Sequence, residues 1–197
     1  MWNQTSMASI CRLPALALLV MLAACASGAT PGAMTPPISE ATLISQNSAL
    51  RSAVDVGRVT GGSETNPLLA SSVSDADFAT ALRQSLRTHA MLALGGERFR
   101  LEATLLELRR PFGGFDLEVT AGVSYRLIRV ADGQEVFTRE IRNAYTAPFS
   151  SSFLAVERLR LANEGAVREN IRQLLSALVT EERVNPGAFS PGGRPGV

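Results

Sequence analysis

The chain has 197 residues, with 19 basic and 18 acidic residues and a formal net charge of +1. This balance excludes the strongly basic surface that nucleic-acid-binding proteins need, so we expect no nucleic-acid partner. Every basic residue is an arginine, and the lack of lysine excludes both Schiff-base chemistry and a P-loop. One histidine and two cysteines are too few for a typical structural zinc site, and we expect no metal or other cofactor.

The N-terminal region has the pattern of a secretory signal. An apolar run extends from Leu13 to Cys25, follows Arg12 and ends in small residues. The run is too short to cross a bilayer, which takes about 20 apolar residues. We therefore expect residues 1–24 to be removed, whether translation starts at Met1 or at Met7.

The sequence LAAC at residues 22–25 resembles the lipobox of bacterial lipoproteins. The resemblance implies that the sulfur of Cys25 carries covalent lipid and that Cys25 is the mature N-terminus. Ala26, in place of an aspartate, is similar to the pattern of lipoproteins that are forwarded to the outer membrane. The resemblance thus implies a lipid-anchored protein of the outer membrane that faces the periplasm.

Two flanking segments differ in composition from the middle of the chain. Residues 25–49 are small, proline-containing and nearly uncharged, and predict a lipidated tether in which Ile38, Leu43 and Ile44 could pack on the domain. Residues 183–197 are rich in proline and glycine and predict a disordered tail. A single folded domain is therefore expected over residues 50–182.

Six elements are predicted within this domain from its hydrophobic periodicity. They are strands over residues 52–60, 99–105, 115–127 and 135–145, and helices over residues 74–93 and 153–182. The first helix has Ser74 as its N-cap and carries Ala90 and Ala93 on its apolar face. Asp132-Gly133 marks the turn before the last strand.

The last helix has an apolar stripe that begins at Val156. Glu164 and Arg168 have the i,i+4 spacing of an ion pair, and Gly165 indicates a kink or a close approach to the sheet. The strand over residues 115–127 alternates apolar and polar residues, which predicts a sheet covered on one face only. The predicted fold is α+β: a strand, a helix, a three-stranded meander and a helix, with both helices packed on one face of one sheet.

Two loops carry residues that could contact a partner or ligand. Arg109, Arg110 and Phe112 lie in the first loop, and Tyr145 and Phe149 lie in the second, which covers residues 145–153. Exposed arginines and aromatics of this kind suit lipid headgroups, a glycan or a protein partner. The alternatives are a wide hairpin connection for the first loop and a simple helix entry for the second.

Catalytic interpretations are less well supported by the residues. His89 lies beside the apolar stripe of the first helix and is predicted to be a packing residue, since the chain has no G-x-S-x-G motif. The glycine-containing segment 61–67 lacks a P-loop lysine and predicts a connecting loop. Strand acids such as Glu102 and Glu118 lie on the polar side of their strands and predict a solvated face. We therefore expect no enzyme.

The lipobox and the order of the elements are similar to those of small periplasmic lipoproteins, such as YajG-like lipoproteins, and of transport-auxiliary lipoproteins. The resemblance implies a non-enzymatic accessory or structural subunit in cell-envelope maintenance or transport. Its expected partners are membrane lipid, through the acylated N-terminus, and an envelope protein. The alternative is a carrier of lipid or another amphiphile, which predicts a cavity between the sheet and the helices. The sequence leaves the oligomeric state open.

Overall fold

The computed structural model describes residues 27–64, 72–110 and 116–190. The predicted lipidation site Cys25 and the predicted contact residue Phe112 lie outside these ranges. The elements are α2 (Pro31–Met34), η2 (Glu40–Thr42), β1 (Val54–Thr60), α3 (Asp75–Thr88), β2 (Phe99–Arg109), β3 (Leu117–Arg129), β4 (Glu135–Ala147), η3 (Phe149–Ser151), α4 (Ala155–Val184) and η4 (Pro186–Phe189).

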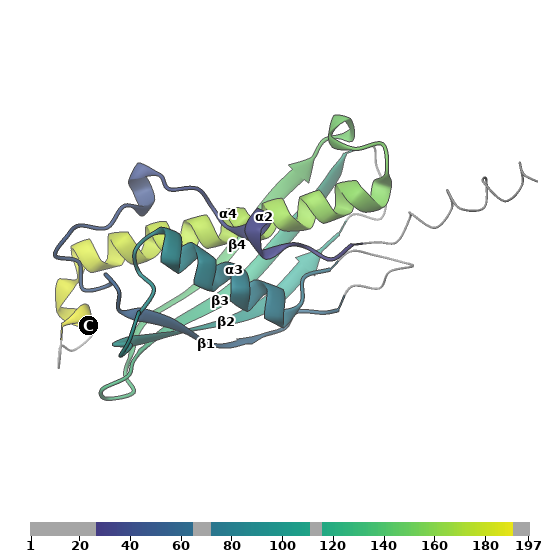
Figure 1. Cartoon of the computed structure of the whole chain (residues 1–197). Helices are drawn as coiled ribbons and strands as arrows, with labels where there is room; N and C mark the ends of the chain where they lie inside the picture. Colours follow the sequence, from purple (N-terminus) through teal and green to yellow (C-terminus); the bar gives the residue numbers. More distant parts are fainter. Residues whose placement is uncertain (1–26, 65–71, 111–115, 191–197) are drawn as a thin grey trace, which may run out of the picture.

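The strands form one mixed sheet in the order β1-β2-β3-β4. β1 pairs with β2 in parallel, and the other two pairs are antiparallel. The helices cover one face of this sheet (Figure 1). The predicted α+β class is confirmed, and so is the face of β3, because Val119, Ala121, Val123, Tyr125 and Leu127 are all buried.

Helix α3 begins as predicted, with the Ser74 hydroxyl accepting a hydrogen bond from the Asp77 N–H. It ends at Thr88, however, and the prediction that it extends to residue 93 is wrong. Ala90 has a φ of 57°, in the left-handed region, and reverses the chain there. The reversal brings Met91 into the core, where its carbonyl oxygen accepts hydrogen bonds from the Ala53 and Val54 N–H groups.

Helix α4 approaches β4 very closely at Gly165. A Cβ at this position would lie 2.3 Å from the ring of Tyr145. The prediction of a close approach is therefore confirmed, and the absence of a side chain is what permits it. Glu164 does not pair with Arg168 as predicted: it bonds to Arg160, while Arg168 donates to the Ala33 carbonyl.

A polar cluster lies inside the sheet–helix interface. The Tyr125 hydroxyl donates to Asn170 Oδ1 over 2.8 Å, and Asn170 Nδ2 donates to the Ile141 carbonyl and to Asn143 Oδ1 over 3.0 and 2.7 Å. Tyr125 and Asn170 are fully buried. A hydrogen-bonded network of this kind fixes the register of α4 on β3 and β4, since a shift would leave buried polar groups without partners.

The chain on both sides of the predicted domain contributes to the packed structure. Phe189, in the segment predicted to be a disordered tail, is 1% exposed and makes an edge-to-face contact with Phe99, with ring centroids 5.8 Å apart. Its burial against Phe99 explains why this part of the tail is ordered.

Residues 27–35, which we call the strap, lie in the segment predicted to be a tether. The Ala29 N–H donates to the Ser72 carbonyl, the Thr30 N–H donates to Glu164, and Met34 is fully buried. Within the strap, α2 contacts both α3 and α4. By contrast, Ile38 and Leu43, for which packing was expected, are more than half exposed. The packed structure thus begins close behind Cys25 in sequence.

Candidate functional site

One end of the domain gathers most of the features that bear on function. The C-terminal ends of β1, β2 and β4 meet there with the N-terminal ends of β3, α3 and α4. The first described residues of the strap lie at the same end, on the right in Figure 1. We call it the strap end.

Four apolar side chains are exposed at the strap end, between β4 and the first turn of α4. They are Phe149, Phe153, Leu154 and Val156, and we call them the apolar rim; their exposed fractions are 42, 90, 64 and 40%. The rings of Phe149 and Phe153 pack edge to face, with centroids 6.2 Å apart. Val156 was predicted to be the start of the buried stripe of the last helix, and its exposure contradicts that prediction.

Arg158 holds the rim in place from behind. Its guanidinium lies 4.7 Å from the centroid of the Phe149 ring and donates to the Ser152 carbonyl over 2.6 Å. The Arg158 residue is only 6% exposed. The positive charge is therefore stacked under an aromatic ring, and the surface presented by the rim is apolar.

The predicted contact residues that the structure describes differ in exposure, two being exposed and two half-buried. Phe149 belongs to the rim, and the Arg109 side chain is 75% exposed at the end of β2. Arg110 is half-buried and donates to the Ser72 hydroxyl. The ring of Tyr145 packs between Gly165 and the Arg168 guanidinium, which gives it a place in the packing of α4 on β4.

Phe153 is the last residue of the predicted contact segment, residues 145–153, whereas Leu154 was not predicted to lie on the surface. The available signal was the apolar run of residues 153–156, which contains no charge and continues into the first residues of α4. Such a run predicts burial by default, because periodicity does not distinguish the first turn of a helix from its packed middle. In the structure Phe153, Leu154 and Val156 are exposed, and the buried apolar residues of α4 begin only at Ala162.

The open face of the sheet carries paired charges. Arg126 bonds to Glu102 and Glu135, and Arg142 bonds to Glu107 and Glu140. Hydrogen bonds from Thr138 and then from Arg126 hold the pKa of Glu135 below its ordinary value. Each of these two arginines lies between two glutamates, so the face is charged and hydrated, which agrees with the predicted solvated face.

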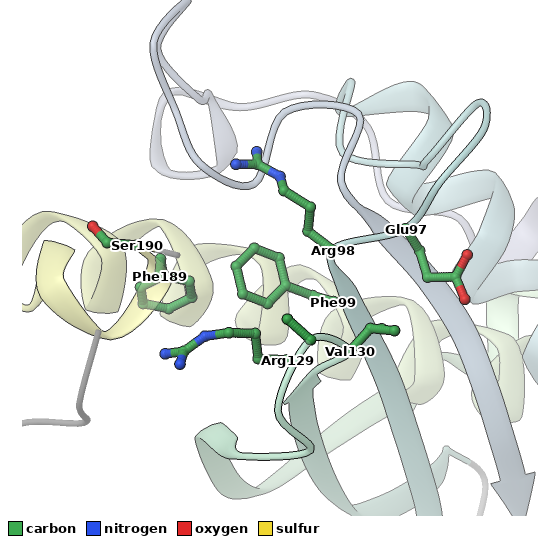
Figure 2. A pocket seen from close by; sticks show the side chains of 8 residues that line it. Glu97, Arg98, Phe99, Arg129, Val130, Phe189 and Ser190 are labelled. Carbon is green, nitrogen blue, oxygen red and sulfur yellow. The ribbon is translucent and has the colours of Figure 1, made fainter. Parts of the chain in front are cut away.

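An apolar pocket of about 250 Å³ lies at the opposite end of the domain (Figure 2). Phe99 and Phe189 line it, beside Arg129, whose side chain donates to Asp132 Oδ2 and to the Ala188 carbonyl, both over 2.6 Å. Ligand pockets usually have volumes of about 300–1,000 Å³. This smaller space is the seam between η4 and the sheet, and its arginine is engaged in holding η4.

The sole histidine has no catalytic arrangement around it. His89 is 5% exposed, and its Nδ1 lies 2.7 Å from the Ser85 carbonyl. The Ser85 hydroxyl donates to the Ala81 carbonyl, so it is not paired with the imidazole. Among residues 27–64, 72–110 and 116–190, no three histidine, cysteine or acidic side chains are grouped to hold a metal ion. Within the same ranges, no helix combines the length and the apolar character needed to cross a membrane.

The structure is similar to those of several bacterial proteins, to different degrees. Protein XCC0632 from Xanthomonas campestris, of family DUF330, matches with a TM-score of 0.56 and 11% identity, over 77% of this chain and 94% of that protein. A protein assigned as a lipoprotein in Caulobacter crescentus matches with a TM-score of 0.47 and 17% identity, over 67% of this chain and 90% of that protein. A minor lipoprotein from Acinetobacter baumannii matches with a TM-score of 0.38 and 12% identity, over 70% of this chain and 96% of that protein.

At these identities the likeness to XCC0632 concerns the fold alone. No protein-family model matches the sequence, and no curated protein is significantly similar to it. The names of the structural neighbours are those of lipoproteins and of proteins without a named activity.

Proposed function

We propose that the chain is a lipoprotein of the outer membrane, acylated at Cys25 and facing the periplasm, that acts as a non-enzymatic accessory or structural subunit of the cell envelope. The observation that carries the proposal is the position of the strap. The chain is hydrogen-bonded to the domain at Ala29 and Thr30, four and five residues after Cys25. An acyl chain at Cys25 would therefore hold the domain directly at a membrane surface.

The interior of the domain supports a structural role over a carrier role. A carrier needs space between the sheet and the helices, but fully buried side chains such as Tyr125, Phe78 and Ile171 lie there. The buried Asn170 of α4 bonds to Tyr125 and to the Ile141 carbonyl of the sheet across this interface. A protein built in this way offers its surface, not its interior, to a partner.

The two cysteines provide a matched test of the anchor. Full-length protein and the variants Cys25→Ala and Cys11→Ala are expressed with their own signal, and each is separated into soluble, inner-membrane and outer-membrane fractions. We expect the native chain and Cys11→Ala in the outer membrane, with an acylated N-terminal peptide that starts at Cys25 in mass spectrometry. Cys25→Ala is expected to lack the acyl group. An unmodified Cys25 in the native protein would refute the proposal.

The accessory role has its own experiment. The native protein is cross-linked mildly in cells, purified in detergent and analysed for every protein that accompanies it. Recovery of one envelope protein in constant ratio supports the accessory role. Co-purified phospholipid in stoichiometric amount, without a protein, would favour the carrier instead.

A further inference from the structure

We propose that the apolar rim is the surface on which the domain rests against the lipid bilayer, so that Phe153 and Leu154 enter the boundary between headgroups and acyl chains. This inference rests on the proposed acylation of Cys25. It adds an orientation to the anchor: the strap end faces the membrane, and the pocket between Phe99 and Phe189 faces away from it.

The length of chain between Cys25 and the strap restricts the distance from the membrane. Thr30 is the fifth residue after Cys25, and an extended chain spans at most about 3.3–3.6 Å per residue, or roughly 17 Å in total. Thr30 is held by both its N–H and its hydroxyl to Glu164, at 2.8 and 3.0 Å. The acylated residue therefore cannot move far from the strap end.

The rim lies within that distance. Glu164 is the ninth residue after Ala155 in α4, which corresponds to about 14 Å along the helix axis at 1.5 Å per residue. The reach of the chain from Thr30 to Cys25 thus matches the offset from Thr30 to the start of α4. The acyl group and the rim can lie in one plane, with the length of α4, about 45 Å for 30 residues, directed away from it.

The chemistry of the rim suits a lipid surface. Phe153 and Leu154 are the most exposed members of an uncharged run, and Arg158 is stacked behind Phe149 and not presented. Large exposed apolar groups beside an anchor mark a site of membrane contact, and a second apolar contribution strengthens attachment by a lipid. Glu157, paired with Arg160 in the next turn, limits how deeply the rim enters.

A single tryptophan can report on this contact. The only tryptophan of the chain, Trp2, lies in the signal, so the mature protein has none. Phe153→Trp places a fluorophore on the rim. Leu94→Trp is the matched control, since Leu94 is 85% exposed in the connection between α3 and β2, at the opposite end of the domain.

Both full-length variants are produced in their acylated form and reconstituted into phosphatidylcholine vesicles. In a series of vesicles, an increasing fraction of the lipid is brominated phosphatidylcholine, which quenches tryptophan that enters the bilayer. We expect a blue-shifted emission that is quenched by bromine for Phe153→Trp, and an unshifted, unquenched emission for Leu94→Trp. Replacing part of the lipid by phosphatidylglycerol is expected to leave the difference unchanged, because the rim is apolar.

The outcomes separate the two proposals. Protein that carries no acyl group and does not bind vesicles overturns the proposed function. Acylated, vesicle-bound protein in which Phe153→Trp is quenched no more than Leu94→Trp overturns the orientation only. A blue shift at Phe153→Trp without bromine quenching, accompanied by cross-linked dimers, also overturns it, because a second copy would then cover the rim.

Discussion

Replacing Gly165 by alanine is a direct test of how α4 packs on the sheet. The new Cβ would lie 2.3 Å from two carbons of the Tyr145 ring, well inside van der Waals contact. The ring has little room to withdraw, because its backbone belongs to β4 and the Arg168 guanidinium lies 5.7 Å from its centroid. Either the helix must move away from the sheet or Tyr145 must leave its position.

The magnitude follows from two opposing contributions. Replacing a glycine inside a helix by alanine stabilises it by about 1 kcal/mol. Forcing extra atoms into a packed site costs about 1–3 kcal/mol, and the short contact and the confined ring place this case at the upper limit. We therefore expect Gly165→Ala to lower the free energy of unfolding by about 2 kcal/mol.

The same substitution should have the opposite effect once the ring is gone. In a Tyr145→Ala background, Gly165→Ala is expected to stabilise the protein by about 1 kcal/mol, which gives a coupling energy of about 3 kcal/mol between the two positions. Urea unfolding followed by circular dichroism measures all four variants, with the slope against urea as a check on two-state behaviour. Gly32→Ala, in α2, has nothing within 4 Å of its new Cβ and is the control.

A stabilising effect of Gly165→Ala in the native background would refute the reasoning, since propensity alone would then decide the outcome. Equal destabilisation with and without the Tyr145 ring would also contradict it. In that case the cost would come from another neighbour of the helix.

Three further predictions concern the polar contacts of α4 and β3. Asn170→Leu leaves the Tyr125 hydroxyl and the Ile141 carbonyl buried without their partner, and we expect urea unfolding to show a loss of about 3 kcal/mol. Burial raises the pKa of the Tyr125 phenol, so above a pH of about 10 the phenol ionises in the unfolded chain before it ionises in the folded protein. The contribution of the buried phenol to stability is therefore full below that pH and is lost as the pH rises above it. Thermal unfolding between pH 8 and 11 should therefore show a steeper alkaline loss for the native chain than for Tyr125→Phe. Glu164→Gln weakens the bonds to Thr30 and Arg160, and hydrogen exchange at Thr30 should become faster while exchange in β3 stays unchanged; equal rates at Thr30 would contradict the role given to Glu164.

The secondary structure was predictable wherever the local sequence alone determines a helix or a strand. The alternation over residues 115–127 and the Ser74 N-cap determine a half-covered strand and a helix start from local chemistry alone. The end of α3 was not predictable in this way, because it depends on a contact with a distant segment. Ala90 adopts a left-handed φ, and the Met91 carbonyl then accepts hydrogen bonds from the Ala53 and Val54 N–H groups. Ordering of Phe189 likewise depends on Phe99, about ninety residues earlier.

The candidate site shows the same division. Phe149 was identified because aromatics beside a serine-rich turn stand out in a sequence. Leu154 was not, because hydrophobic periodicity does not distinguish the exposed first turn of a helix from its packed middle. The partner of Glu164 was mispredicted for a related reason: Arg168, with the correct spacing, is recruited by the Ala33 carbonyl of the strap.

The strap also determines where mechanical force enters the protein. A pull on a lipid at Cys25 reaches the domain first at Ala29, which bonds to Ser72 just before α3, and at Thr30, which bonds to Glu164. Through Glu164 it passes into α4, a helix of 30 residues that packs on β3 and β4. It does not reach β1 first, the edge strand that pairs on one side only and would peel from the sheet one bond at a time. Load applied through the membrane would therefore be spread over the longest element of the domain as shear, and the sheet would be left intact until α4 itself slides.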